Sequence, residues 1–118
     1  MARHNAQGSA AETLAMSHLK AQGLRLKERN FRTRGGEIDL IMQQGDTLVF
    51  IEVRFRQSGD YGSPAETVTR HKQQRLINAA SQYLQKYRVD MPCRFDIVAI
   101  SGPRQERIEW IRDAFQSG

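Results

Sequence analysis

Two carboxylates, Asp39 and Glu52, lie in neighbouring apolar segments where a sheet would normally bury hydrocarbon. Asp39 belongs to the run 37–41 and Glu52 to the run 47–56, and the turn signal Gly45-Asp46 separates the two runs. Such a break between apolar runs predicts a β-hairpin, whose pairing places Asp39 opposite or nearly opposite Glu52. Two carboxylates this close repel each other, and burial adds to the cost. A hard divalent cation with oxygen ligands, Mg²⁺ or Mn²⁺, would remove the repulsion.

The alternation of side chains along a strand leaves a second interpretation open. Glu52, Arg54 and Arg56 share one face of their strand, because successive side chains point to opposite faces. On a solvated face these arginines would pair with both acids, and no metal would be needed. Glu37 shares a face with Asp39 and is either a further acid of the site or a partner of its ligands. The spacing leaves both roles open.

The segments 36–41 (GEIDLI) and 50–56 (FIEVRFR) together give an Asp, a hairpin turn and then Glu-x-Arg. This order resembles the Asp, hairpin and Glu-x-Lys signature of the PD-(D/E)XK nuclease superfamily, and it looks very like the YraN-like family of small bacterial proteins. That family is similar in pattern to archaeal Holliday junction resolvases. The resemblance covers nearly the whole chain. It implies a restriction-endonuclease-like α/β fold, with a mixed central β-sheet flanked by helices, over residues 1–118 as one domain.

The resemblance also implies the chemistry, which is metal-dependent hydrolysis of phosphodiester bonds in DNA. Asp39 and Glu52 would hold Mg²⁺ or Mn²⁺, and the resemblance adds the Val53 carbonyl as a further ligand. Arg54 stands where the superfamily usually has lysine, and a guanidinium that stays protonated cannot act as a base. It can still stabilise charge on a phosphate. Three outcomes therefore remain: the metal alone activates water, Lys72 acts in place of the lysine, or catalysis is weak.

Glu12 has two interpretations. Residues 8–23 are predicted to form a helix that Ser9 caps, with Gly23 as its end, and Glu12 has the spacing of a capping box. By resemblance, the pattern Gly8-x-x-x-Glu12-x-x-Ala15 matches the family's first motif, a helical Glu that faces the metal. In that interpretation Glu12 is a third acidic site residue, acting on the metal directly or through water.

A basic helix is predicted at residues 69–88, with Thr69 as its cap and no acid among residues 68–88. Cations in its first turn lie against the positive end of the helix dipole, so an anion such as phosphate would suit this terminus. By resemblance, Lys72 and Gln73 match the family's fourth motif, beside the nuclease centre. The alternative is a solvated basic face. The predicted nucleic-acid contacts are Arg34, Arg56, Arg70, Lys72, Gln73 and Arg75.

The remaining elements complete the order helix, strand, hairpin, helix, strand, strand. Further strands are predicted at 24–31 and 94–100, with a short last strand around 108–111. The segment 57–68 contains two glycines and a proline and is predicted to be a loop that could close over substrate. Tyr61 in this loop either covers the core or stacks on a base.

Bulk properties limit the class of protein. The chain has 118 residues and a formal net charge of +5, which suits nucleic acid or another polyanion as a partner. Its one cysteine, Cys93, is expected to be a buried thiol in a reducing compartment. No apolar run has the length of a signal peptide or a membrane span. We therefore expect a cytoplasmic protein that does not associate with membranes.

Three classes of function fit these observations. The first is a metal-dependent nuclease acting on structured or single-stranded DNA, and the second is a catalytically weak or inactive nucleic-acid-binding module of the same fold. The third is a protein-interaction domain whose basic charge serves an acidic partner or solubility. Salt-dependent DNA binding would separate the third class from the other two. A resolvase-like activity would also require a homodimer, because two symmetric cuts need two sites.

Overall fold

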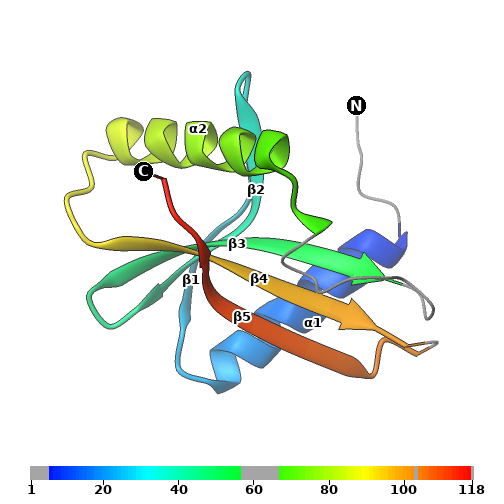
Figure 1. Ribbon diagram of the computed structural model, residues 1–118. Coiled ribbons are helices and arrows are strands. Elements are labelled where there is room, and N and C mark those ends of the chain that lie inside the picture. Colours follow the sequence, from blue (N-terminus) through cyan, green and yellow to red (C-terminus); the bar gives the residue numbers. More distant parts are fainter. Residues whose placement is uncertain (1–5, 57–66, 103, 118) are drawn as a thin grey trace.

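The computed structural model describes residues 6–56, 67–102 and 104–117, which form a five-stranded sheet with one helix on each face (Figure 1). The elements follow one another as α1 (Ala6–Ala21), β1 (Arg25–Thr33), β2 (Gly36–Gln44), β3 (Thr47–Arg56), α2 (Arg70–Lys86), β4 (Cys93–Ser101) and β5 (Arg107–Phe115). The strand order is β1-β2-β3-β4-β5. Only β3 and β4 pair in parallel, and α2 lies in the connection between them. The predicted mixed sheet flanked by helices is confirmed.

Each helix covers one face of the sheet with its own hydrophobic core. On one face Leu76, Ala80 and Tyr83 of α2 pack against Ile38 and Phe50. On the opposite face the small residues of α1 and Leu19 pack against the alternate strand residues, which include Leu40 and Ile51. Alternate residues of β2 and β3 therefore belong to two different cores, because both faces of these central strands are buried.

The predicted hairpin between β2 and β3 is confirmed. Its ladder runs from Gln44 opposite Thr47 to Leu40 opposite Ile51, and Gly45 occupies the turn with φ of 57°. That left-handed conformation favours glycine, which explains why the break in the apolar pattern falls at this residue.

The start of α1 differs from the prediction. The helix begins at Ala6, before Ser9, so Ser9 is an interior residue and cannot form a capping box with Glu12. The end of the helix is as predicted: Gly23 has φ of 99°, and the Leu24 amide donates to the Leu19 carbonyl. The predicted cap of α2 is also confirmed, since the Thr69 hydroxyl accepts from the Lys72 amide at 3.1 Å.

The remaining expectations concern Cys93, the last strand, the loop 57–68 and membrane spans. Cys93 is exposed, so the predicted buried thiol is wrong; it is the first residue of β4, at the end of the sheet. The last strand is longer than predicted, because β5 extends to Phe115. The predicted closing loop and Tyr61 lie outside the described residues, apart from the final positions of that segment. Within the described part of the chain, no helix is long and apolar enough to cross a membrane.

Candidate active site

A pocket of about 690 Å³ opens where α1, the centre of the sheet and the first turns of α2 meet. Its polar lining comes from all three layers: Glu12 from α1, Glu37 and Asp39 from β2, Glu52 and Arg54 from β3, and His71, Lys72 and Arg75 from α2. Residues that are far apart in the sequence therefore meet in one pocket, and each is held by a helix or a strand.

Asp39 and Glu52 lie on the floor of this pocket, where the β2–β3 ladder opens. The ladder ends at Leu40 opposite Ile51, and one further step in the same register puts Asp39 opposite Glu52, as the sequence predicts. The Asp39 Oδ2 atom accepts a hydrogen bond of 2.8 Å from the Val53 amide. Both carboxylates are buried, with exposed fractions of 8% for Asp39 and 6% for Glu52.

The environment of Asp39 opposes a negative charge. Burial raises the pKa of this carboxyl well above its usual value, and the neighbouring Glu52 charge and the more distant Glu12 charge raise it further, while the Val53 amide acts in the opposite direction. Burial and the paired carboxylate Glu52 therefore both disfavour a negative charge on Asp39.

Glu52, by contrast, has two cationic partners on a single oxygen. The Lys72 Nζ atom lies 3.2 Å and the Arg54 Nη1 atom 3.4 Å from Glu52 Oε2. Lys72 reaches the sheet from the first turn of α2, which the Thr69 cap fixes. The alternative that both acids lie on a solvated face is wrong, because Asp39 and Glu52 are buried. The pairing of Glu52 with Arg54 that this alternative predicts is present.

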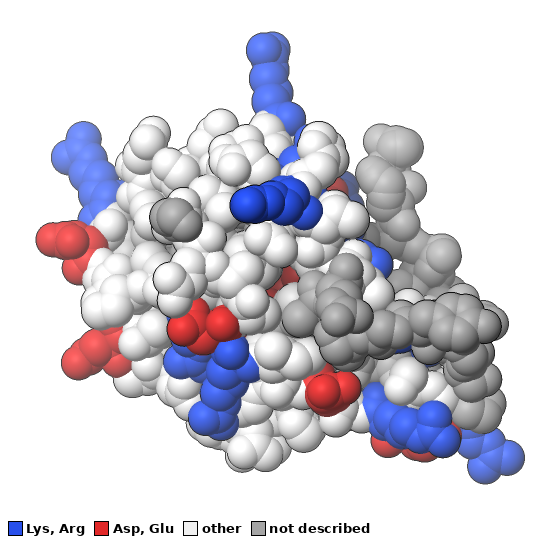
Figure 2. Space-filling model, viewed as in Figure 1, with Lys and Arg blue, Asp and Glu red and all other residues white. Residues whose placement is uncertain are grey.

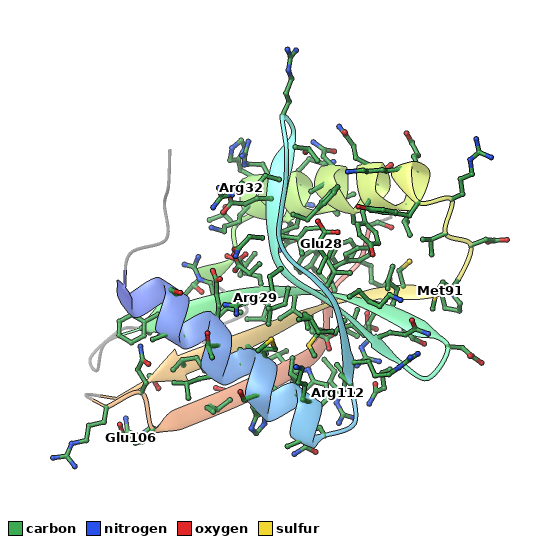
Figure 3. The ribbon with its side chains drawn as sticks, turned by 180° about the vertical axis from the view of Figure 1, so that it is seen from behind. Glu28, Arg29, Arg32, Met91, Glu106 and Arg112 are labelled. Carbon is green, nitrogen blue, oxygen red and sulfur yellow. The ribbon has the colours of Figure 1, made fainter. Side chains whose placement is uncertain are left out.

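Glu12 enters the same pocket from α1 but has its own cation. It is 5% exposed, and its Oε1 atom lies 3.7 Å from a terminal nitrogen of Arg29 on β1. In Figure 3, Arg29 is labelled on the strand beside α1. Among the described residues, no group of three His, Cys, Asp or Glu side chains is close enough to hold a metal ion. Glu12 thus lines the pocket without completing a three-carboxylate cluster.

The donor set at the pocket floor suits a hard divalent cation. Two carboxylates and a backbone carbonyl, completed by water, are the kind of ligands that Mg²⁺ and Mn²⁺ take. Burial and the neighbouring Glu52 charge raise the pKa of Asp39, and a bound cation would favour the charged form of this carboxyl. The residues present therefore fit such an ion, with Asp39, Glu52 and the Val53 carbonyl as its candidate ligands.

The predicted site residues divide into two groups. Glu12, Asp39, Glu52, Val53, Arg54, Lys72 and Arg75 all line the pocket. Arg34, Arg56, Arg70 and Gln73 are not among its lining residues; Arg34 lines another pocket, and the Gln73 amide donates to the Val68 carbonyl at 3.0 Å.

Sequence reasoning missed two residues. His71 lines the pocket, and its position beside Lys72 at the start of α2 was the available signal. Arg29 pairs with Glu12 across two elements, and no local pattern indicates that contact.

The fold and the site together define an α/β protein with paired carboxylates at the centre of a mixed sheet, consistent with a restriction-endonuclease-like fold. Residues 11–100 match the model of the family described as "Uncharacterised protein family UPF0102", and the chain belongs to this family. This confirms the resemblance to the YraN-like family at the level of the family.

Relatives of similar length support the assignment. A "UPF0102 protein" of Saccharophagus degradans is 52% identical over 117 residues, which cover 98% of this chain and 97% of the relative. "UPF0102 protein NE0719" of Nitrosomonas europaea is 53% identical over 109 residues, covering 92% of each chain. A "UPF0102 protein" of Stutzerimonas stutzeri is 48% identical over 120 residues, covering 99% of this chain and 100% of the relative.

Proposed function

We propose that the protein is a metal-dependent endonuclease of the PD-(D/E)XK superfamily that hydrolyses phosphodiester bonds of DNA. One observation carries the proposal: the buried carboxylates of Asp39 and Glu52 meet at the floor of a pocket whose α2 wall is basic. A protein that only bound DNA would gain nothing from acids facing phosphate, because phosphate contacts come from cations and amides.

Asp39, Glu52 and the Val53 carbonyl would hold Mg²⁺ or Mn²⁺, and Glu12 would act on the ion through water. When bound, such an ion stabilises charge on phosphoryl oxygens and lowers the pKa of water. Glu12 keeps its position through Arg29, whose terminal nitrogen lies 3.7 Å away.

Lys72 and Arg54 would divide the work of the superfamily's lysine. Arg54 stays protonated, so it stabilises the charge that develops on the phosphate but accepts no proton. Lys72 carries the amine and lies 3.2 Å from Glu52, so it can hold the attacking water or the phosphate next to the ligand carboxylate. Arg75, one turn further along α2, lines the same pocket and would contact the phosphate backbone.

A second candidate function is a nucleic-acid-binding module that cleaves weakly or not at all. The observation that favours it is the double pairing of Glu52 Oε2 with Lys72 and Arg54, which neutralises this carboxylate without a metal. In that case the same pocket would bind phosphate through its cations alone.

We propose a role in DNA repair, recombination or processing, with structured, junction or single-stranded DNA as substrate and the cytoplasm as location. A homodimer would be needed for paired cuts at a junction.

The experiment is cleavage of labelled junction, flap, duplex and single-stranded DNA with Mg²⁺ or Mn²⁺. Glu52→Gln removes a ligand charge with little change of shape, and Asp46→Asn makes the same change in the exposed β2–β3 turn. We expect cutting by the wild type and by Asp46→Asn, and a loss of at least about 100-fold in Glu52→Gln. Metal-independent cutting, or equal cutting by both variants, would contradict the proposal. DNA binding without cutting would favour the second candidate.

A further inference from the structure

A second pocket, of about 310 Å³, lies between β1 and the C-terminal half of α2. Its lining residues are Phe31, Arg32, Thr33, Arg34, Gln82 and Lys86. Three of these six side chains are cations and none is an acid. Like charges that gather in a groove repel one another, so an anionic ligand is the natural occupant. We call this pocket the β1–α2 groove.

The groove is separated from the candidate active site by the tip of the β1–β2 hairpin, which crosses α2 (Figure 3). The crossing is close: a Cβ atom on Gly36 would collide with the Arg75 carbonyl, and one on Gly35 would lie 3.2 Å from the Asn78 Cβ. Arg75 lines the candidate active site, whereas Arg34, beside the two glycines, lines the groove. The two pockets therefore lie on either side of this crossing.

One flank of α2 extends from one pocket to the other and passes beneath the hairpin. Arg75, Asn78, Gln82 and Lys86 recur at i, i+3, i+7 and i+11, which places them along the same side of the helix. The first of them lines the candidate active site and the last two line the groove. At 1.5 Å per residue the flank from Arg75 to Lys86 is about 16 Å long, so a strand that passes over the hairpin tip spans at least roughly the axial length of five phosphates on one strand of duplex DNA.

The cations of the groove differ in the neighbouring groups that interact with them. The Arg32 Nε atom lies 3.7 Å from Glu37 Oε1, so its charge is partly offset. The Lys86 Nζ atom lies 5.9 Å from the Phe31 ring centre and 5.2 Å from that of Tyr87, within the range of cation–π attraction. Lys86 also suits the negative end of the helix dipole. That local effect does not account for Arg32 and Arg34 on the opposite wall.

We propose that the β1–α2 groove is a second subsite for the nucleic-acid backbone, so that one strand runs from the candidate active site over the hairpin tip to Lys86. The inference rests on the proposed function, because it takes the substrate to be nucleic acid. Figure 2 shows Lys and Arg side chains around α2 and the β1–β2 hairpin tip on the face viewed in Figure 1, which is opposite to the face on which Figure 3 shows the hairpin crossing α2. Arg34 and Lys86 contact phosphates on the two walls.

The test is the salt dependence of DNA binding, measured by fluorescence anisotropy without divalent cations so that no cutting occurs. The variant Arg34→Ala/Lys86→Ala is compared with Lys20→Ala/Arg25→Ala, which removes two exposed cations elsewhere and gives the same net charge. With single strands longer than the roughly five-phosphate span, we expect the slope of log K against log salt to fall by about 1.4 for the groove variant and to stay unchanged for the control. With strands shorter than that span, both variants should bind like the wild type.

Several results would overturn the inference: equal slopes for the groove variant and its control, equal losses on long and short strands, or no DNA binding at all. Displacement of DNA by polyglutamate at equal charge concentration would also overturn it, in favour of an acidic protein partner. Cleavage of DNA by the wild type is measured in a separate experiment with Mg²⁺, so that the endonuclease and the subsite are tested independently. Binding with the expected slopes but no cutting would reject the endonuclease and leave the subsite standing, whereas cutting with equal slopes would reject the subsite alone.

Discussion

The Lys72 Nζ atom lies 3.2 Å from Glu52 Oε2, which joins the first turn of α2 to the centre of β3. The two residues are 20 positions apart in the sequence, and the Thr69 cap fixes the helix turn that brings them together. The strand has Arg54 where the nuclease superfamily that the sequence resembles has lysine, and Lys72 gives the pocket an amine from a different element. This contact is the basis of the first two predictions.

Replacement of Lys72 tests whether this amine takes part in cleavage. We expect Lys72→Ala to lower the single-turnover rate on DNA by about 100-fold, because a positioned proton-handling group contributes on that scale. Lys72→Arg should recover phosphate binding but not the rate. Lys20→Ala on the exposed face of α1 is the matched control. A rate unchanged in Lys72→Ala would remove this residue from the mechanism.

Arg54→Lys tests the substitution in the strand. A lysine at this position would restore the Glu-x-Lys order, so it should rescue Lys72→Ala by about tenfold or more while changing the wild-type rate little. The measurement is the single-turnover rate of the two single variants and the double variant. Additive losses without rescue would show that an amine on β3 cannot replace the one on α2.

Asp39 should make the protein less stable at neutral pH than an uncharged residue would. Its folded-state pKa is raised by burial and by Glu52, so the stability of the protonated form is fully present below about pH 4, the unfolded pKa, and is lost as pH rises through the folded pKa. We expect Asp39→Asn to raise Tm at neutral pH and to lose this advantage at low pH. Thermal melts across pH check the prediction, and a lower Tm for Asp39→Asn at pH 7 would contradict it.

The crossing of the hairpin over α2 depends on Gly36. A methyl group at this position collides with the Arg75 carbonyl, a backbone atom that cannot rotate away, so we expect Gly36→Ala to destabilise the fold by about 1–3 kcal/mol. Gly35→Ala is the control, because its Cβ would meet only the Asn78 side chain, at 3.2 Å. Urea denaturation compares the two variants, and equal stability would show that the crossing can widen.

The elements that could be predicted were those specified by local sequence. The β2–β3 hairpin follows from alternation and from the Gly45 turn, and its register then sets Asp39 opposite Glu52. The cap of α2 follows in the same way from Thr69. Because these features depend on residues close in sequence, their periodicity and turn chemistry are enough to place them.

The features that were missed depend on contacts between distant elements. Local spacing cannot tell whether Glu12 belongs to a capping box or faces the sheet, because it fits both. The start of α1 at Ala6 excludes the capping box, and the contact with Arg29 places Glu12 toward the sheet. Cys93 was expected inside, yet it begins β4 at the end of the sheet, where the core no longer covers it. His71 lines the pocket beside Lys72 at the start of α2, so its role depends on where this helix meets the sheet.

The most direct measurement is a calorimetric titration of the protein with Mn²⁺, comparing the wild type with Asp39→Asn and with Asp46→Asn. The account predicts that one ion binds per chain in the wild type and in Asp46→Asn. At any pH at which Asp39 is protonated in the free protein, binding should release a proton. It predicts no such binding in Asp39→Asn. Absence of binding in the wild type, or equal binding in Asp39→Asn, would contradict a divalent metal centre at Asp39 and Glu52.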